Sequence, residues 1–313
     1  MKSWWKPHRE TRYAVVMPVT GGLLGLALQI RPDPASPRCQ LIGHAHLDNA
    51  SLGTDALLQL ADQIGARKAR WVMLLDHADY QTLSLPAPPV PAAELDPALR
   101  WTLAEQLPAP ATDACLAWLR VPRHEHMPGK TEQMYVFASR RQTVEGIARL
   151  FRQAGLDLSA VDVQETAQRN VASLIATPTE AVALLRINRL DMEFTLSHEG
   201  ELHYHRWVPN VPQKQVDELQ SAEHLVLQVQ RSLDYVDRNL HYLPIRQLWL
   251  ALASPLAGLR ELLIGNLTLP VAGLDLNAHF DFAAGPELRD PALQATFLPL
   301  LGACLRFSEP GWH

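Results

Sequence analysis

Residues 134–170 constrain the fold more than any other stretch, because they predict a strand, a helix, a second strand and a second helix in direct succession. The apolar run 134–138 is typical of a strand, and Ser139 with Gln142 has the spacing of a helix capping box. Gly155 stands where a helix takes a left-handed residue to end. A strand that returns through a helix to another strand usually builds one mixed or parallel sheet. We therefore expect an α/β protein with a ligand site in the crevice beyond its strand ends.

Composition and charge narrow the possible functions. The 313 residues are enough for two domains, and a hydrophobic share of 47% is ample for packed cores. A formal net charge of −5 argues against a nucleic-acid partner. The three cysteines lie far apart without disulfide or zinc spacing, which favours a reducing compartment: Cys39, Cys115 and Cys304. Since we find neither a secretory leader nor a clean apolar span, we expect a cytoplasmic protein.

The apolar pattern divides the chain into two similar halves, each with a strand meander followed by alternating helices and strands. The first half predicts strands at 13–19, 23–30, 39–47 and 71–75 and a helix at 54–65. A small strand–helix–strand insertion is predicted at 86–131. The second half predicts strands at 181–187, 191–196, 201–208, 248–252 and 274–277, and helices at 216–240, 256–264 and 293–305. We expect a first lobe at 1–180 and a second lobe at 181–313.

Three segments, by their order and spacing together, resemble the PilM-like proteins of type IV pilus assembly. They are VPAAELDPALRW at 90–101, AGLDLSAVDVQETAQRN at 154–170 and VQRSLDYVDRNL at 229–240. The resemblance implies an actin-like ATPase fold, with two α/β lobes around a central cleft and the insertion at 86–131 in the first lobe. It also implies a cytoplasmic docking component of type IV, MSHA-like pilus biogenesis, recruited to the inner membrane. Its partner would be a PilN-type or MSHA-type inner-membrane assembly protein, bound through its N-terminal cytoplasmic tail.

In the PilM-like proteins that the chain resembles, the insertion helps to shape the peptide groove. Trp101 and Trp118 lie within it, and either tryptophan is a candidate lining residue of that groove, with core packing as the alternative. At the N-terminus, Trp4, Trp5 and Lys6 predict a peripheral membrane contact, since indole rings suit the headgroup layer. The alternative there is that the pair folds back onto the domain.

The resemblance also predicts where a nucleotide would bind, and those positions are altered. In the first hairpin, Met17 stands near the expected aspartate, and Gly21 and Gly22 keep a flexible turn. The expected Asp-x-Gly of the second hairpin falls near Arg186 and Asn188. Around the expected glycine pair of the third element stand Leu252, Ala253 and Ser254.

Without the aspartates expected in the two hairpins, the chain lacks the carboxylates that usually bind magnesium. No GxxxxGK[ST] motif is present either. We expect no cofactor and no catalysis, with Asp191 as a partial substitute for the missing acid. The alternative is an active actin-like protein that binds ATP with magnesium. Arg186 would pair with a phosphate in that case, and otherwise we expect it to face solvent at a strand edge.

The histidines and the acidic residues near the second helix have simpler interpretations. His44 and His46 share one strand face, as do His203 and His205, and we expect all four to face water rather than to bind metal. We expect Glu165 to begin a helix, where its charge complements the helix dipole.

Overall fold

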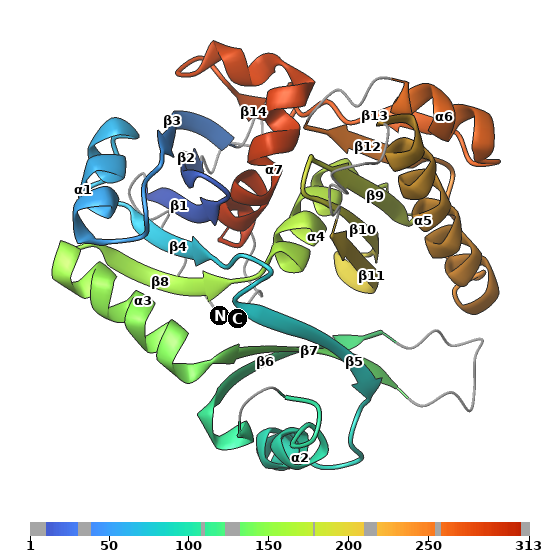
Figure 1. The fold of residues 1–313 in the computed structure, drawn as a ribbon, viewed down its shortest axis with the longest axis horizontal. Coiled ribbons are helices and arrows are strands. Elements are labelled where there is room, and N and C mark those ends of the chain that lie inside the picture. Colours follow the sequence, from blue (N-terminus) through green and yellow to red (C-terminus); the bar gives the residue numbers. More distant parts are fainter. Residues whose placement is uncertain are drawn as a thin grey trace, which may run out of the picture.

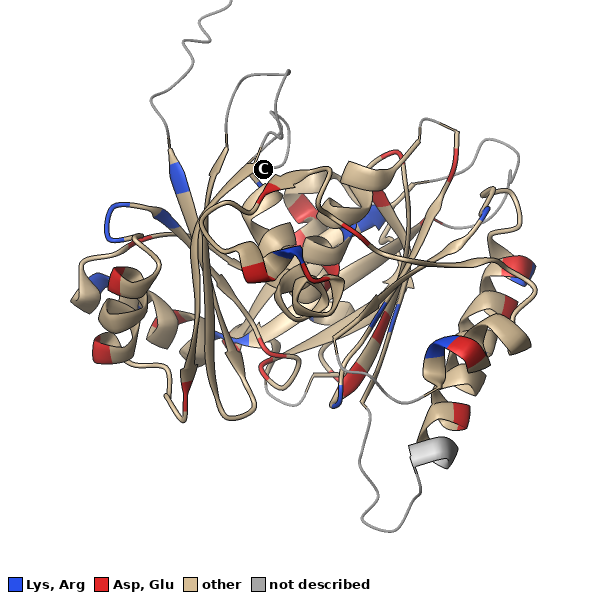
Figure 2. Ribbon diagram, turned by 90° about the horizontal axis from the view of Figure 1, so that it is seen from above, with Lys and Arg blue, Asp and Glu red and all other residues tan. Residues whose placement is uncertain are grey.

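The computed structural model describes residues 11–30, 39–107, 110–122, 132–177, 179–209, 218–253 and 258–307. Trp4, Trp5, Lys6 and Ser254 lie outside the described residues. The described chain forms two lobes with a smaller sheet beside them (Figure 1). Acidic and basic residues are interspersed over both lobes (Figure 2). Among the described helices, none combines the length and the apolarity needed to cross a membrane.

The first lobe is built on a six-stranded sheet in the order β14-β3-β2-β1-β4-β8. The strands are β1 (Arg12–Val19), β2 (Gly22–Ile30), β3 (Cys39–Asp48), β4 (Arg70–Leu74), β8 (Asp157–Asp162) and β14 (Phe280–Asp281). One face is covered by α1 (Thr54–Gln63) and α3 (Arg141–Ala154), which enclose an apolar core. The hairpin, the third strand and the first helix are therefore confirmed as predicted.

The second lobe is built on a five-stranded sheet in the order β11-β10-β9-β12-β13. The strands are β9 (Val182–Ile187), β10 (Asp191–His198), β11 (Glu201–Pro209), β12 (Leu248–Leu252) and β13 (Val271–Gly273). The helices α5 (Glu218–Asn239) and α6 (Leu259–Asn266) pack over it. The predicted strand at 274–277 is wrong. After Leu274 pairs with β12, the chain turns away, and the Leu276 N–H donates to Gln294 Oε1 at 2.8 Å.

Each lobe repeats the same order of elements and ends in a helix that packs against the other lobe. The two helices are α4 (Gln164–Ile175) and α7 (Pro291–Leu305). From the first half, α4 packs on β9, β10 and β11, while α7 packs on β1, β2 and β4 as well as on β12. The strand β14, from the second half, pairs with β3. The halves are thus interlocked rather than merely adjacent.

The two exchanged helices cross at Gly302 of α7. An added Cβ there would lie 2.0 Å from the carbonyl oxygen of Ala167 on α4. Asn170 donates its Nδ2 to the Gly302 carbonyl at 2.9 Å, so a buried amide fixes the crossing. Only glycine permits this approach.

The small sheet has the order β5-β7-β6 and is antiparallel. Its strands are β5 (Tyr80–Pro86), β6 (Ala114–Val121) and β7 (Gln133–Arg140), with α2 (Leu95–Thr102) on one face. The sheet therefore takes strands from both sides of the segment 86–131. The prediction that the strand at 134–138 joins one sheet with the next strand is wrong, because β7 is central here and β8 pairs with β4.

The predicted helix after this strand is present, but its predicted capping box is not. Ser139 belongs to β7, and its hydroxyl donates to the Asp79 carbonyl at 2.8 Å. The N-cap of α3 is Arg140, which has no side-chain cap hydrogen bond. At the other end, Gly155 has a φ of 65° and ends the helix as predicted.

Candidate functional site between the lobes

The first two turns of the α4 helix are polar on nearly every side and yet enclosed. Its buried polar residues are Gln164, Glu165, Thr166, Gln168, Arg169 and Asn170. A helix polar all round normally faces water, but α4 lies between the lobes and finds partners on the second sheet. Gln168 donates its Nε2 to Leu184 O at 2.9 Å and to Thr195 Oγ1 at 3.0 Å. These bonds satisfy groups that would otherwise be costly to bury.

Arg186, on β9, contacts both the start of α4 and the neighbouring strand of the second sheet. Its Nη2 donates to Gln164 Oε1 at 3.1 Å, to Asp191 Oδ1 at 3.2 Å and to Glu193 Oε2 at 3.2 Å. The expectation that Arg186 faces solvent is wrong, since its side chain is only 4% exposed. Burial alone lowers the pKa of the guanidinium, but the two carboxylates outweigh burial and raise it. The positive charge of Arg186 is therefore already matched within the protein.

The second hairpin is closed by Asn188. Its Oδ1 accepts from the backbone N–H of Leu190 at 2.6 Å and of Asp191 at 2.8 Å. Its Nδ2 donates to Asp191 Oδ1 at 2.8 Å. Asp191 is thus held by Asn188 and Arg186, and its carboxylate is engaged within the chain.

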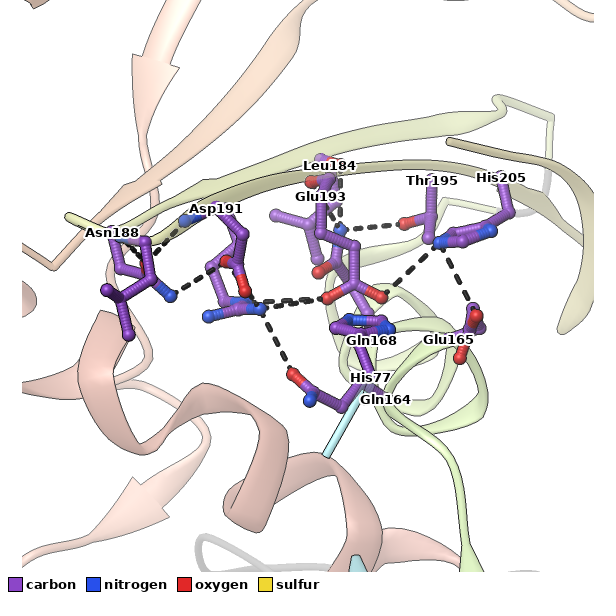
Figure 3. A network of polar contacts seen from close by, with 12 residues as sticks. His77, Gln164, Glu165, Gln168, Leu184, Asn188, Asp191, Glu193, Thr195 and His205 are labelled. Atoms are coloured by element: carbon purple, nitrogen blue, oxygen red, sulfur yellow. Dashed lines mark hydrogen bonds and ion pairs between the residues drawn. The ribbon is translucent and has the colours of Figure 1, made fainter. Parts of the chain in front are cut away.

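Glu193 and one further carboxylate, that of Glu165, flank a buried histidine. His205 Nε2, on β11, lies 3.7 Å from Glu165 Oε1 and 3.6 Å from Glu193 Oε1 (Figure 3). Burial lowers the pKa of His205, but the two carboxylates outweigh it and raise the pKa. For Glu193, burial raises the pKa, while His205 and Arg186 outweigh it and lower the pKa to about 2. We call the ionisable side chains that meet here the interlobe cluster: Glu165, Asp191, Glu193, His205 and Arg186.

The expectation of water-facing histidines is wrong for His203 and His205, which are buried because α4 and the small sheet cover that face of β11. It is also wrong for His44, which is half-buried and contacts Glu287 at 2.6 Å. His46 is exposed as predicted.

Glu165 connects α4 to the small sheet. It stands in the first turn of α4, as predicted, but its carboxylate is fully buried. Its Oε2 accepts from the Tyr80 hydroxyl at 2.7 Å and its Oε1 from the Thr82 hydroxyl at 2.5 Å. Burial, and next the charge of Glu165, raise the pKa of Tyr80 well above its ordinary value. Glu165 therefore acts as a hydrogen-bonded link to β5 in addition to its place at the helix start.

A cavity of about 420 Å³ opens beside this carboxylate, and we call it the junction cavity. It lies where β5 and β7 of the small sheet meet β11 and the start of α4. Its walls include His77, Tyr80, Tyr135, Glu165, His205 and Trp207.

A second cavity, of about 320 Å³, lies where the small sheet meets α3, and we call it the small-sheet groove. Its walls include Asp79, Gln81, Leu107, Ala138, Arg140 and Thr143. Neither candidate tryptophan lines it. Trp101 is 84% exposed on α2, and Trp118 is half-buried on β6 against the core of the small sheet.

The structure places the other predicted cleft positions in the cores and turns of the lobes. Met17 and Ala253 pack into the same apolar cluster, while Leu252 packs into the core of the second lobe. Gly21 has a φ of 89° at the tip of the first hairpin. An added Cβ on Gly22 would lie 2.1 Å from the Leu47 carbonyl oxygen. Gly21 is thus required by the turn, and Gly22 by the close approach of β3.

Glu193, Tyr80 and the buried position of His205 were not predicted from the sequence. A pattern for Glu193 was present. Along β10, Asp191, Glu193, Thr195 and Ser197 alternate with buried apolar residues. The opposing helix α4 is equally polar. If β10 and α4 had been predicted to pack against each other, their polar faces would have indicated a buried polar network. Tyr80 precedes the expected insertion, and we find no local pattern that marks it.

Two lobes of repeated topology with exchanged helices define an actin-like ATPase fold. Among solved structures, the chain is similar to the PilM–PilN type IV pilus biogenesis complex, with a TM-score of 0.74 and 19% identity over 97% of this chain and 100% of that one. It is also similar to a Bacteroides thetaiotaomicron protein described as having an actin-like ATPase fold and unknown function. That match has a TM-score of 0.50 and 10% identity over 92% of this chain and 95% of that one.

The cytoplasmic domain of EpsL, an inner-membrane component of the Vibrio cholerae type II secretion system, is similar as well. Its TM-score is 0.51, with 16% identity over 77% of this chain and 82% of that one. No protein-family model matches the chain, and no curated protein matches its sequence.

Proposed function

We propose that this protein is a docking component of type IV pilus biogenesis. It acts at the cytoplasmic face of the inner membrane and binds the cytoplasmic tail of a PilN-type assembly protein. The fold of the PilM–PilN complex, matched over nearly the whole of both chains, supports this function. Within pilus systems, the three sequence segments favour MSHA-type machinery.

The observation that carries the proposal is the small-sheet groove. It lies between the small sheet and α3, and its walls combine apolar side chains such as Leu107 with charged ones such as Asp79 and Arg140. Its volume of about 320 Å³ suits a few side chains of an extended peptide rather than a folded partner. We assign the tail to this groove.

The charge of the interlobe cluster supports a role without catalysis. Phosphate groups need cations and backbone donors. Here the buried guanidinium of Arg186 is matched by Asp191 and Glu193, and Glu165 stands close by. An entering phosphate would meet carboxylates rather than free cations, so we propose that the ancestral nucleotide site is degenerate. The alternative function, an active actin-like ATPase, requires magnesium ATP to bind despite this cluster.

Blocking the small-sheet groove tests the assignment. Thr143 lines it from the first turn of α3 and is half-buried, so Thr143→Trp places an indole in the space that a tail residue would occupy. We expect at least tenfold weaker binding of a synthetic tail peptide, measured by calorimetric titration. A tenfold loss corresponds to about 1.4 kcal/mol.

The matched control is Thr102→Trp, which adds the same side chain at an exposed position of α2 that does not line the groove. It should bind like the unaltered protein. Unchanged binding by a folded Thr143→Trp variant would remove the groove from the proposal. Failure of every PilN-type and MSHA-type tail to bind the unaltered protein would remove the docking function.

A further inference from the structure

The strand β5 forms an open edge of the small sheet. It pairs with β7 on one side and, among the described residues, with no strand on the other. An unpaired edge presents a row of main-chain N–H and C=O groups, to which another extended chain can bind. The edge of β5 is therefore a candidate interaction surface.

The register of the β5–β7 pair identifies which main-chain groups face this edge. The Ala87 N–H donates to the Glu132 carbonyl at 2.7 Å, and these two residues continue the register of the pair. In an antiparallel pair, opposite residues alternate between hydrogen-bonded and non-hydrogen-bonded pairs. The main-chain groups of Thr82 and of Ser84 therefore point away from β7, and no hydrogen bond within the described residues engages them.

β5 lacks the features that usually protect an edge strand, which are charge, proline, a bulge or short length. Residues 81–85 include no charged residue and no proline, and their register with β7 is regular. The other described edges differ. β13 and β14 are short, β8 and β11 have irregular registers, and β6 carries Arg120. Of the described edges, that of β5 is therefore the least protected.

The junction cavity lies along this edge. Its walls include residues 81–84 of β5 together with Arg206 and Trp207 of β11. Within 81–84 the two end residues are exposed and the two between them are half-buried, so a ligand can reach the edge. The volume of about 420 Å³ has room for a few residues of one extended chain, whereas a second sheet would meet β11.

The same edge begins at the small-sheet groove. Tyr80 and Gln81, at the start of β5, line both the groove and the junction cavity. Ser84 follows Gln81 by three residues, roughly 10 Å at the rise of a strand. A peptide that leaves the groove at this end of β5 would therefore meet the main chain of Thr82 and Ser84 within a few residues.

We propose that the tail of the PilN-type partner continues from the small-sheet groove along β5 as an added strand. Its main chain pairs with the N–H and C=O groups of Thr82 and Ser84, and these hydrogen bonds contribute affinity whatever its side chains are. Side chains of a strand alternate between its two faces, so alternate tail residues enter the junction cavity, where Tyr135 and Trp207 favour apolar groups. The strand addition rests on the proposed docking function and extends it beyond the groove.

A proline at the edge tests the pairing. Ser84→Pro removes one outward N–H and adds a ring at the edge, but it removes no hydrogen bond to β7, and proline is tolerated on edge strands. The matched control is Ser84→Ala, which removes the hydroxyl and keeps the N–H. In calorimetric titration with a tail peptide that binds the unaltered protein, we expect at least fivefold weaker binding by Ser84→Pro. Ser84→Ala should bind within about twofold of the unaltered protein.

Amide hydrogen exchange of the unaltered protein tests the same pairing without a substitution. The Thr82 and Ser84 amides should exchange at least tenfold more slowly with saturating tail peptide than without it. The Trp118 amide, on β6, is the control, because by the same alternation it points to the opposite edge of the sheet. Its exchange should not change.

The outcomes separate the strand addition from the docking function. Failure of every tail to bind the unaltered chain would remove both. Tail binding that Thr143→Trp weakens and a folded Ser84→Pro does not, or unchanged exchange at Thr82 and Ser84, would overturn the strand addition alone. Protection of these two amides that grows with protein concentration, without peptide, would assign the edge to a second copy of the chain and overturn the proposal.

Discussion

At the residue scale, His205 makes the stability of the protein depend on pH. Its pKa is raised in the folded state, because two carboxylates outweigh its burial. Below the unfolded pKa of about 6.5 both states carry the proton, and the stabilisation is fully present. As pH rises through the folded pKa, the native state loses its imidazolium and the stabilisation disappears.

Replacing this histidine should therefore cost more at low pH than at high pH. We expect the difference in unfolding free energy between the unaltered protein and His205→Gln to be largest near pH 6. It should shrink as pH rises above about 6.5, by at most about 1.4 kcal/mol per unit. Urea unfolding at several pH values measures it. His46→Gln, at an exposed strand position, should show no such trend, and an equal trend in both variants would contradict the assignment.

At the residue scale, the sequence predicted backbone conformation better than it predicted which side chains are buried. Gly155 and Gly21 were predicted correctly, because the need for a left-handed residue is local. Arg186, Glu193 and His205 could not be placed, because their burial depends on which surface a helix from the other half covers. Alternation along β10 shows that one strand face is polar, but not that a polar helix lies against it.

At the element scale, the crossing of α4 and α7 should tolerate no side chain at Gly302. In Gly302→Ala, the added methyl would lie 2.0 Å from the Ala167 carbonyl oxygen, so the two helices must separate. We expect the unfolding free energy to fall by about 3 kcal/mol, the upper range for overpacking. Chemical denaturation measures the loss.

The matched control is Gly146→Ala, in the interior of α3, where an added Cβ meets nothing within 4 Å. Because alanine favours the helix over glycine, this change should stabilise the protein by about 0.5–1 kcal/mol. A Gly302→Ala variant as stable as the unaltered chain would show that the helices do not cross this closely.

The element scale also explains which predictions succeeded. Strands and helices with clear periodicity were found, including both hairpins and the helix that contains residues 293–305. The prediction that β7 shares a sheet with β8 was wrong, because a strand followed by a helix carries no information about which sheet it joins. β5 and β6, far from β7 in sequence, decide this by pairing on both of its sides.

At the scale of the whole molecule, two interlocked lobes keep the frame of an actin-like fold, and a small sheet is attached beside them (Figure 1). The segment resemblance predicted this architecture, because it depends on the order of elements. It did not predict the exchange of α4 and α7 or the acidic cluster between the lobes. The exchange depends on contacts between residues more than a hundred positions apart, such as Asn170 with Gly302. The cluster depends on contacts between α4 and the second sheet, such as Gln164 with Arg186.

The most direct test of the account is a calorimetric titration of the full chain with a PilN-type or MSHA-type cytoplasmic tail peptide, with and without millimolar magnesium ATP. We predict saturable one-to-one binding with the same Kd in both conditions, because the tail uses the small-sheet groove while the interlobe cluster takes no nucleotide. Tail binding that appears only with magnesium ATP, or that changes at least tenfold with it, would contradict the account.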